Sequence, residues 1–158
     1  MIINIIMDYK KYRNIVYQVI GAAMEVHKEL NWGLLEPIYN EAIHMELADR
    51  GIKHEIQKNI PCFYKEQKME KHYLMDLVVE DDVIVELKSA SKLISAHRAQ
   101  LFNYMRLTQK PIGLLINFGQ PRLQGERYGL DPITNECVLL DKDMNELHIE
   151  DICSPEDE

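Results

Sequence analysis

One segment of this 158-residue chain combines carboxylates and a lysine at a spacing that can support chemistry. Asp76 precedes an apolar stretch and the acidic turn 80–82, and Glu86 and Lys88 follow that turn. Alternate residues of a strand share a face, so Glu86 and Lys88 point to the same side among apolar neighbours. Burying a carboxylate and an ammonium is costly unless they pair or bind something. We therefore take Asp76, Glu86 and Lys88 as the candidate reactive group.

The position of Asp76 relative to Glu86 depends on the length of the turn between them. Opposed residues of an antiparallel hairpin share a face. A loop of three residues, 80–82, places Asp76 directly opposite Glu86. A two-residue loop shifts the pairing by one residue and turns Asp76 to the other face. A site with two carboxylates therefore requires an odd loop or a bulge at this point.

Two carboxylates on adjacent strands are hard oxygen ligands that suit Mg²⁺ or Mn²⁺. A divalent cation there can activate water and stabilise charge on a phosphodiester, and Lys88 can hold the water or neutralise the developing charge. Paired carboxylates can also hydrolyse a sugar linkage. The close Glu86–Lys88 pair on a buried strand fits phosphodiester chemistry better. An ExK triplet alone arises often by chance, whereas the whole pattern of Asp, hairpin and ExK is far more specific.

The helix predicted to follow Lys88, residues 94–108, carries a polar stripe. His97, Gln100 and Tyr104 are three and four residues apart and line one face of it. Gln100 can hydrogen-bond a phosphate or a water near Lys88. A solvated polar face explains the same spacing about equally well.

Three further candidates lie on the two helices that precede the hairpin. Glu36 stands at the start of the second helix, where favourable interaction with the helix dipole is reason enough for a carboxylate. Tyr39 lies one turn later on the same face. His27 is on the first helix, where a packed or surface histidine is more common than a ligand.

Hydrophobic periodicity predicts the elements that position these residues. Helices are expected over 9–30, 35–50 and 94–108, and strands over 60–64, 72–79, 83–88 and 112–118, with two short strands at 127–130 and 137–140. This order predicts an α/β or α+β sandwich with a mixed central sheet flanked by helices. We expect one domain over 1–130, with a loose N-terminal arm at 1–8, and an acidic C-terminal appendage over 131–158 that frays at 154–158.

Charge is distributed unevenly along the chain. The formal net charge is −8, yet residues 1–130 hold 17 Lys and Arg against 16 Asp and Glu, and residues 131–158 hold 1 against 10. The near-zero net charge of residues 1–130 permits a local basic patch, although the sequence has no long basic stripe of the kind that indicates a nucleic-acid partner. The acidic segment provides solubility or, in a sharper hypothesis, mimics nucleic acid and covers basic parts of the site.

Cysteine usage and hydropathy bear on the compartment. Cys62, Cys137 and Cys153 are odd in number and far apart, which predicts reduced thiols in a cytoplasmic protein. No apolar run approaches the roughly 20 residues of a membrane helix, so no membrane partner is expected.

Taken together, the motifs resemble the GxxExxY proteins, a bacterial and archaeal group in the PD-(D/E)xK nuclease superfamily. Gly33-Leu34-Leu35-Glu36-Pro37-Ile38-Tyr39 fits the signature, and Asp76, Glu86 with Lys88, Gln100 and the run 113–119 follow in the family's order. The resemblance covers residues 17–130. Three departures stand out: Met75 replaces the superfamily's proline, Asn31-Trp32-Gly33 replaces a Gly-Pro-Gly type turn, and Pro37 is unusual after the glutamate.

The resemblance implies a restriction-endonuclease-like αβββαβ core with the active site at one edge of the central hairpin. It implies that Asp76 and Glu86 bind Mg²⁺, that Lys88 is catalytic, and that Glu36 completes the metal site. Gln100 matches a residue often found on the following helix, and His27 and Tyr39 match family positions without assigned roles.

Two functions follow as hypotheses. One is a Mg²⁺-dependent endo- or exonuclease, a hydrolase acting on nucleic acid with DNA favoured. The other is a catalytically silent module that binds a nucleic acid or a partner protein. A homodimer would let a small nuclease domain meet two strands.

Overall fold

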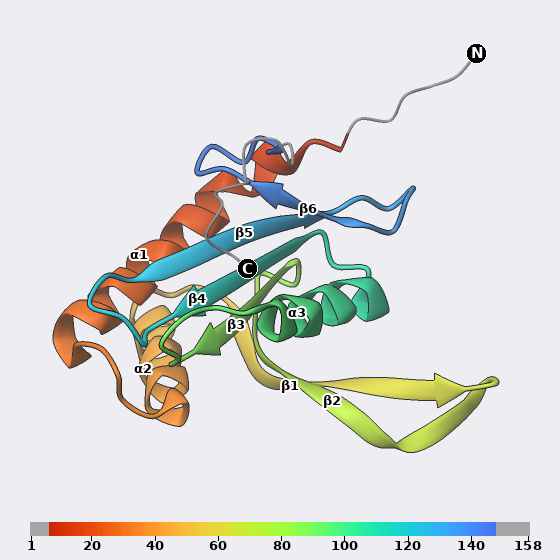
Figure 1. Ribbon diagram of the computed structural model, residues 1–158, viewed down its shortest axis with the longest axis horizontal. Helices are drawn as coiled ribbons and strands as arrows, with labels where there is room; N and C mark the ends of the chain where they lie inside the picture. Colours follow the sequence, from red (N-terminus) through yellow and green to blue (C-terminus); the bar gives the residue numbers. More distant parts are fainter. Residues whose placement is uncertain (1–6, 148–158) are drawn as a thin grey trace.

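The computed structural model describes residues 7–147 as three α-helices, a short 3₁₀ turn and six strands (Figure 1). The helical elements are η1 (Tyr9–Tyr12), α1 (Arg13–Leu30), α2 (Glu36–Asp49) and α3 (Ser95–Thr108). The strands are β1 (His54–Tyr64), β2 (Gln67–Val79), β3 (Val83–Lys88), β4 (Ile112–Asn117), β5 (Gln124–Leu130) and β6 (Cys137–Leu140). They form one sheet in chain order, with β3 and β4 parallel and the other neighbouring pairs antiparallel.

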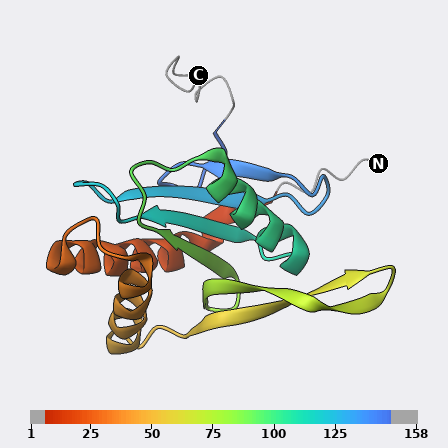
Figure 2. The ribbon, with the colours of Figure 1, turned by 60° about the horizontal axis from the view of Figure 1, so that its bottom comes forward.

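Helices cover both faces of this mixed sheet, which confirms the predicted α+β sandwich (Figure 2). One core joins α1 and α2 to alternate residues of the central strands, such as Leu77, Val85 and Leu114. A second core joins α3 to the intervening residues, such as Ile84 and Leu115. Both faces of β3 and β4 are therefore buried, which explains the continuous apolar run of β4.

The turn between α1 and α2 is held by one buried tyrosine. Tyr39 is fully buried and stacks on Phe118, with ring centroids 4.4 Å apart. Its hydroxyl donates to the Asn31 carbonyl (2.7 Å) and accepts from the Leu34 N–H (3.1 Å). Gly33, at φ +83°, donates its N–H to the Phe118 carbonyl (3.0 Å). These bonds fix the loop against the end of β4 and place Glu36 at the first residue of α2.

The β2–β3 hairpin has the odd loop that a two-carboxylate site requires. Val79 pairs with Val83 and Leu77 with Val85, so three residues, 80–82, form the turn. Glu80 and Asp81 adopt positive φ values of 50° and 65° to close it. This register keeps Asp76 and Glu86 in step across the two strands.

The β1–β2 hairpin is longer than the sequence pattern predicts, and its outer part projects from the sheet (Figures 1 and 2). We call residues 61–74 the arm. All of the arm except Cys62 is exposed, including Phe63, Tyr64 and Tyr73. Residues 67–71 were not expected as strand because they lack apolar alternation, and a strand that buries neither face does not need it.

Both ends of the described chain join the sandwich. Strand β6 pairs with β5, and Leu140 and Met144 are buried in the same core as α1. Two residues of the loose N-terminal segment expected at 1–8 are described. Met7 packs against that core, and Asp8 caps η1 by accepting from the Lys10 N–H (3.0 Å). Residues 1–6 and 148–158, including the expected frayed end, lie outside the described residues. No helix among residues 7–147 is long and apolar enough to cross a bilayer.

Replacing Tyr39 by Phe should lower the free energy of unfolding by about 1 kcal/mol, because two part-buried hydrogen bonds to the backbone of the turn are lost. Urea denaturation measures this loss. The matched control is Tyr17→Phe, since Tyr17 is 78% exposed. Equal stability of the Tyr39 variant and the wild type would show that the hydroxyl does not hold the turn.

Candidate active site

Asp76 and Glu86 lie where β2 and β3 stop pairing through their main chains. The last backbone pair of this ladder is Leu77 with Val85. Beyond it, the Asp76 N–H donates to Glu86 Oε1 (3.1 Å), and the Leu87 N–H donates to Asp76 Oδ2 (3.1 Å). Each carboxylate therefore accepts a hydrogen bond from a main-chain N–H of the neighbouring strand, and this bond fixes its position.

An irregularity in β1–β2 sets the direction of Asp76. Ile56 pairs with Leu77 and Lys58 with Met75, but Gln57 and Asp76 between them are not paired. Gln57 has φ +49°, in the left-handed region. Met75 packs in the α3 core although simple alternation with Leu77 would send it to the α1 face. The break in alternation leaves Asp76 half-buried between the two layers.

Burial and like charge dominate the electrostatics of the pair. Glu86 is 2% exposed. This desolvation, followed by the nearby charge of Asp76, raises the pKa of Glu86 to about 9, and Lys88 offsets only part of the effect. A cation placed between the two carboxylates would remove both penalties.

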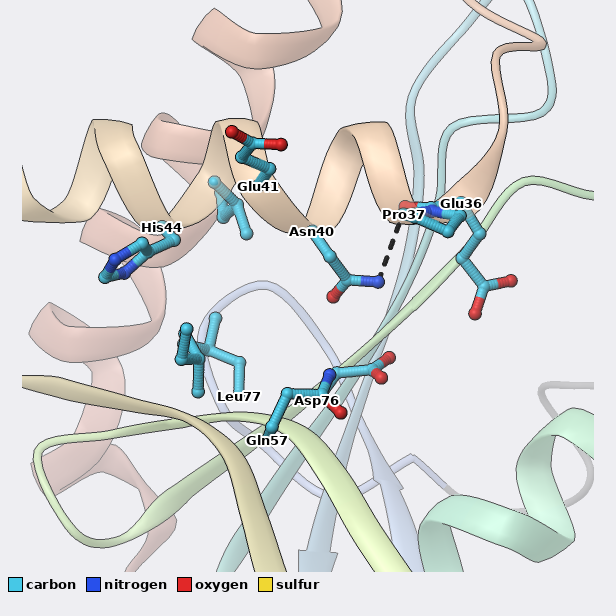
Figure 3. Close-up of a pocket in the computed structure, with 10 residues that line it drawn as sticks. Glu36, Pro37, Asn40, Glu41, His44, Gln57, Asp76 and Leu77 are labelled. Atoms are coloured by element: carbon cyan, nitrogen blue, oxygen red, sulfur yellow. Dashed lines mark hydrogen bonds between the residues drawn. The ribbon is translucent and has the colours of Figure 1, made fainter.

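Glu36 approaches this pair from α2. Its pKa is raised mainly by burial and further by Asp76, while Lys88 and the Ser89 backbone N–H act in the opposite direction. Figure 3 shows Glu36 on the helix and Asp76 on the strand facing it, with both carboxylates toward the same end of a cavity. Among residues 7–147, however, no three His, Cys, Asp or Glu side chains are arranged to hold a metal ion.

A chain of hydrogen bonds links Lys88 to α3. Lys88 Nζ donates to Gln100 Oε1 (2.8 Å), and Gln100 Nε2 donates to the Tyr104 hydroxyl (2.9 Å). The helix itself is anchored to β5 by Arg98, whose Nε lies 2.7 Å from Glu126 Oε1. The Gln100 Oε1 atom is therefore held in a fixed position as the hydrogen-bond acceptor for Lys88.

His97 occupies the first turn of α3 near this chain of bonds. Its Nδ1 accepts from the Ile94 N–H (3.2 Å), which caps the helix. Burial lowers the pKa of His97, and the charges of Lys88 and Arg98 lower it further.

The structure thus brings together seven of the nine residues singled out from the sequence: Glu36, Asp76, Glu86, Lys88, His97, Gln100 and Tyr104. His27 lies elsewhere, with Nε2 3.0 Å from the Gln120 carbonyl oxygen, in a separate cavity that shares no lining residue with the first. Tyr39 holds the α1–α2 turn and is fully buried.

Asn117, which the sequence argument did not select, fixes the loop after Lys88. Its side chain is fully buried, accepts from the Ala90 and Gly119 N–H groups (2.9 and 3.0 Å) and donates to the Ala90 carbonyl (3.0 Å). A side chain at Gly119 would collide with the Ala90 backbone. The sequence carried one signal for this role. Asn117 is a single amide at the end of an apolar strand, and a buried polar group needs hydrogen-bond partners.

Residues 13–128 match the model of the PD-(D/E)XK nuclease superfamily, and the chain belongs to that superfamily. No curated protein matches the chain.

Among solved structures, the chain is similar to one described as "Crystal structure of SSO0001", with a TM-score of 0.50 and 15% sequence identity. The match covers 79% of this chain and 63% of that chain. At this identity the likeness shows the fold alone.

The raised pKa of Glu86 predicts a pH-dependent stability in EDTA. Folded Glu86 keeps a proton up to a pKa of about 9, whereas an unfolded glutamate releases it near its ordinary 4.5. The free energy of unfolding should therefore fall as the pH rises between these values. Glu86→Gln, which cannot ionise, should flatten this fall and add on the order of 2–4 kcal/mol at pH 8.

Urea denaturation from pH 5 to pH 8 tests this expectation. Glu29→Gln is the matched control, because Glu29 is exposed on α1. Parallel pH profiles for the wild type and Glu86→Gln would contradict the assignment.

Proposed function

We propose that this chain is a Mg²⁺- or Mn²⁺-dependent nuclease that hydrolyses phosphodiester bonds of nucleic acid, with DNA favoured as substrate. The observation that carries the proposal is the buried Glu86 carboxylate beside Asp76, 2% exposed and with a pKa raised to about 9. A buried pair of carboxylates is stable in ionised form when a cation compensates it. Membership of a nuclease superfamily gives this pair its chemical context.

The donor set fits a hard divalent cation. Asp76 and Glu86 would bind it through carboxylate oxygens, and Glu36 would support it from the start of α2. When bound, such a cation supplies Lewis acidity and lowers the pKa of a coordinated water. The backbone N–H groups of Asp76 and Leu87 already occupy one oxygen of each carboxylate. The remaining oxygens are thereby oriented for the cation.

Lys88 and Gln100 act on the phosphate or the attacking water. Lys88 Nζ has three donors, of which one is taken by Gln100 Oε1. The others are available to hold a water or to neutralise charge that develops on a phosphate oxygen. Tyr104 receives the Gln100 amide N–H, so the amide oxygen faces Lys88. Gln100 is therefore a positioning residue for Lys88.

The arm supports a nucleic-acid substrate. It carries Lys65, Lys68 and Lys71 against two glutamates, together with exposed aromatic side chains. Lysines neutralise phosphates and aromatic rings stack on bases. Tyr73, at the base of the arm, packs edge-on against Tyr104 with ring centroids 5.5 Å apart. A nucleic-acid strand that lies along the arm would extend to Gln100 and Lys88.

One observation favours the alternative of a silent module that binds nucleic acid or a partner protein. Within residues 7–147, no third His, Cys, Asp or Glu side chain joins Asp76 and Glu86 in a cluster able to hold a metal ion. A silent module would bind without cutting, so metal binding and cleavage separate the two functions.

Calorimetry should show Mg²⁺ or Mn²⁺ binding to the wild type and a loss of at least about 100-fold in affinity for Asp76→Asn and Glu86→Gln, because each removes an anionic ligand. Asp49→Asn, an exposed carboxylate at the end of α2, is the control and should bind as the wild type. Wild-type cleavage of single- and double-stranded DNA and RNA is then assayed with the metal present. A protein that binds nucleic acid but cuts none of it would favour the silent module.

Lys88→Ala should lower the cleavage rate by about 10³-fold, since a donor to the transition state is removed. Gln100→Ala should lower kcat by about tenfold and leave Mg²⁺ affinity unchanged, because Lys88 loses its fixed acceptor. Gln67→Ala, at the exposed tip of the arm, is the matched amide control for kcat. Full activity of Lys88→Ala would remove this residue from the mechanism.

A further inference from the structure

A cavity of about 450 Å³ opens beside Asp76, between α2 and the β1–β2 hairpin (Figure 3). Glu36 and Asp76 border one end of it. Its walls are apolar, and two amide side chains lie among them. These lining residues are Pro37, Ile43, Ile56 and Leu77, with Asn40 and Gln57 as the amides. The volume lies within the range of small-molecule sites, roughly 300–1,000 Å³.

The charges around this cavity restrict what can enter it. Its lining includes three acidic residues, Glu36, Glu41 and Asp76, and one histidine, His44, but no lysine or arginine. An anionic group would be repelled from it, whereas a neutral, flat group could lie between the apolar walls. A phosphate attached to that group would stay at the Asp76 end of the cavity, where a cation would neutralise the charges of the phosphate and of the carboxylate.

The two amides can recognise the edge of such a group. Asn40 Nδ2 donates to the Glu36 carbonyl oxygen (3.4 Å), which steadies the side chain across the cavity from β2 (Figure 3). The Gln57 side chain has no hydrogen bond to any of residues 7–147 and is exposed at the cavity. An amide provides both donors and an acceptor, as the edge of a nucleobase requires.

The backbone at Gln57 is strained at this position. A non-glycine residue at φ +49° is uncommon, and such strain gathers at functional sites. Gln57 and Asp76 face each other at this unpaired step, and both line the cavity, while Asp76 is also close to Glu36. One irregularity of the hairpin thus serves both sites.

We propose that this cavity receives an unpaired nucleobase, from a nucleotide whose phosphate lies at Asp76 and Glu86. The inference rests on the proposed nuclease function and specifies its substrate. A base inside a duplex cannot reach the cavity, and leaving the stack costs least for a single-stranded or mismatched nucleotide. The substrate is therefore a nucleic acid with an unpaired nucleotide next to the scissile phosphate, and Asn40 and Gln57 determine the preferred base.

Fluorescent bases test this proposal without relying on cleavage. Single-stranded oligonucleotides carry 2-aminopurine or pyrrolocytosine at each position in turn, and Ca²⁺ replaces Mg²⁺ because it takes the same oxygen ligands. Fluorescence should rise at one position when the wild type binds, because that base leaves the stack. Ile56→Trp, which fills the cavity from an exposed position on β1, should abolish this rise.

Gln57→Glu is the second variant, because it keeps the side-chain size and removes the amide donors. It should change the relative affinity for the four bases at that position by about tenfold, the effect of one lost base contact. Gln67→Glu is its matched control and should leave base preference unchanged. Calorimetry should give unchanged Mg²⁺ affinity for Ile56→Trp, because this variant changes no charge near Asp76.

The outcomes separate this inference from the proposed function. A strand that is bound and cut, with no rise at any position or with a rise that survives Ile56→Trp, overturns the base cavity and leaves the nuclease proposal standing. Failure of the wild type to bind or cut any strand in the presence of metal overturns both.

Discussion

The organisation of this site depends on an exchange of main-chain for side-chain hydrogen bonds at the open end of one hairpin. There Asp76 accepts from Leu87, and Glu86 accepts from Asp76. The exchange holds the buried Glu86 beside the half-buried Asp76 in the middle of the sheet, where little water screens the two groups from each other. The surrounding elements follow from this constraint: α2 brings Glu36 to it, and α3 brings Gln100 to Lys88.

Most of the interior around these two acidic groups is apolar or hydrogen-bonded, and the buried Arg127 Nε is the exception among residues 7–147. Strands β3 and β4 are buried on both faces, and their apolar side chains fill the two cores. Polar groups within this interior have partners of their own: Asn117 binds the backbone of the loop after Lys88, and Tyr39 binds that of the α1–α2 turn. Both loops are thus fixed by buried polar side chains at the end of β4, where Ser89 Oγ of one donates to the Leu34 carbonyl of the other.

The sequence predicted those features that periodicity and counting control. Alternation placed Glu86 and Lys88 on one face. Counting placed Asp76 opposite Glu86 on the condition of a three-residue turn, which the structure has. Helix spacing aligned His97, Gln100 and Tyr104. The arm was underestimated because its strands bury neither face, and the contributions of Asn117 and Gln57 depend on tertiary approach and local backbone strain, which leave no periodic trace. The extent of the C-terminal unit was likewise hidden, because Leu140 and Met144 reach a core formed by distant residues.

The parallel pairing of β3 with β4 has a consequence for the order of assembly. The β2–β3 hairpin closes across three residues, whereas Val83 meets Ile112 only after α3 has crossed the sheet. Distant contacts cost more loop-closure entropy and form later than local ones. A nascent chain can thus align its carboxylates early, but the loop that follows Lys88 waits for Asn117 from β4. The full set of groups around Asp76 and Glu86 is therefore complete only once the domain has folded.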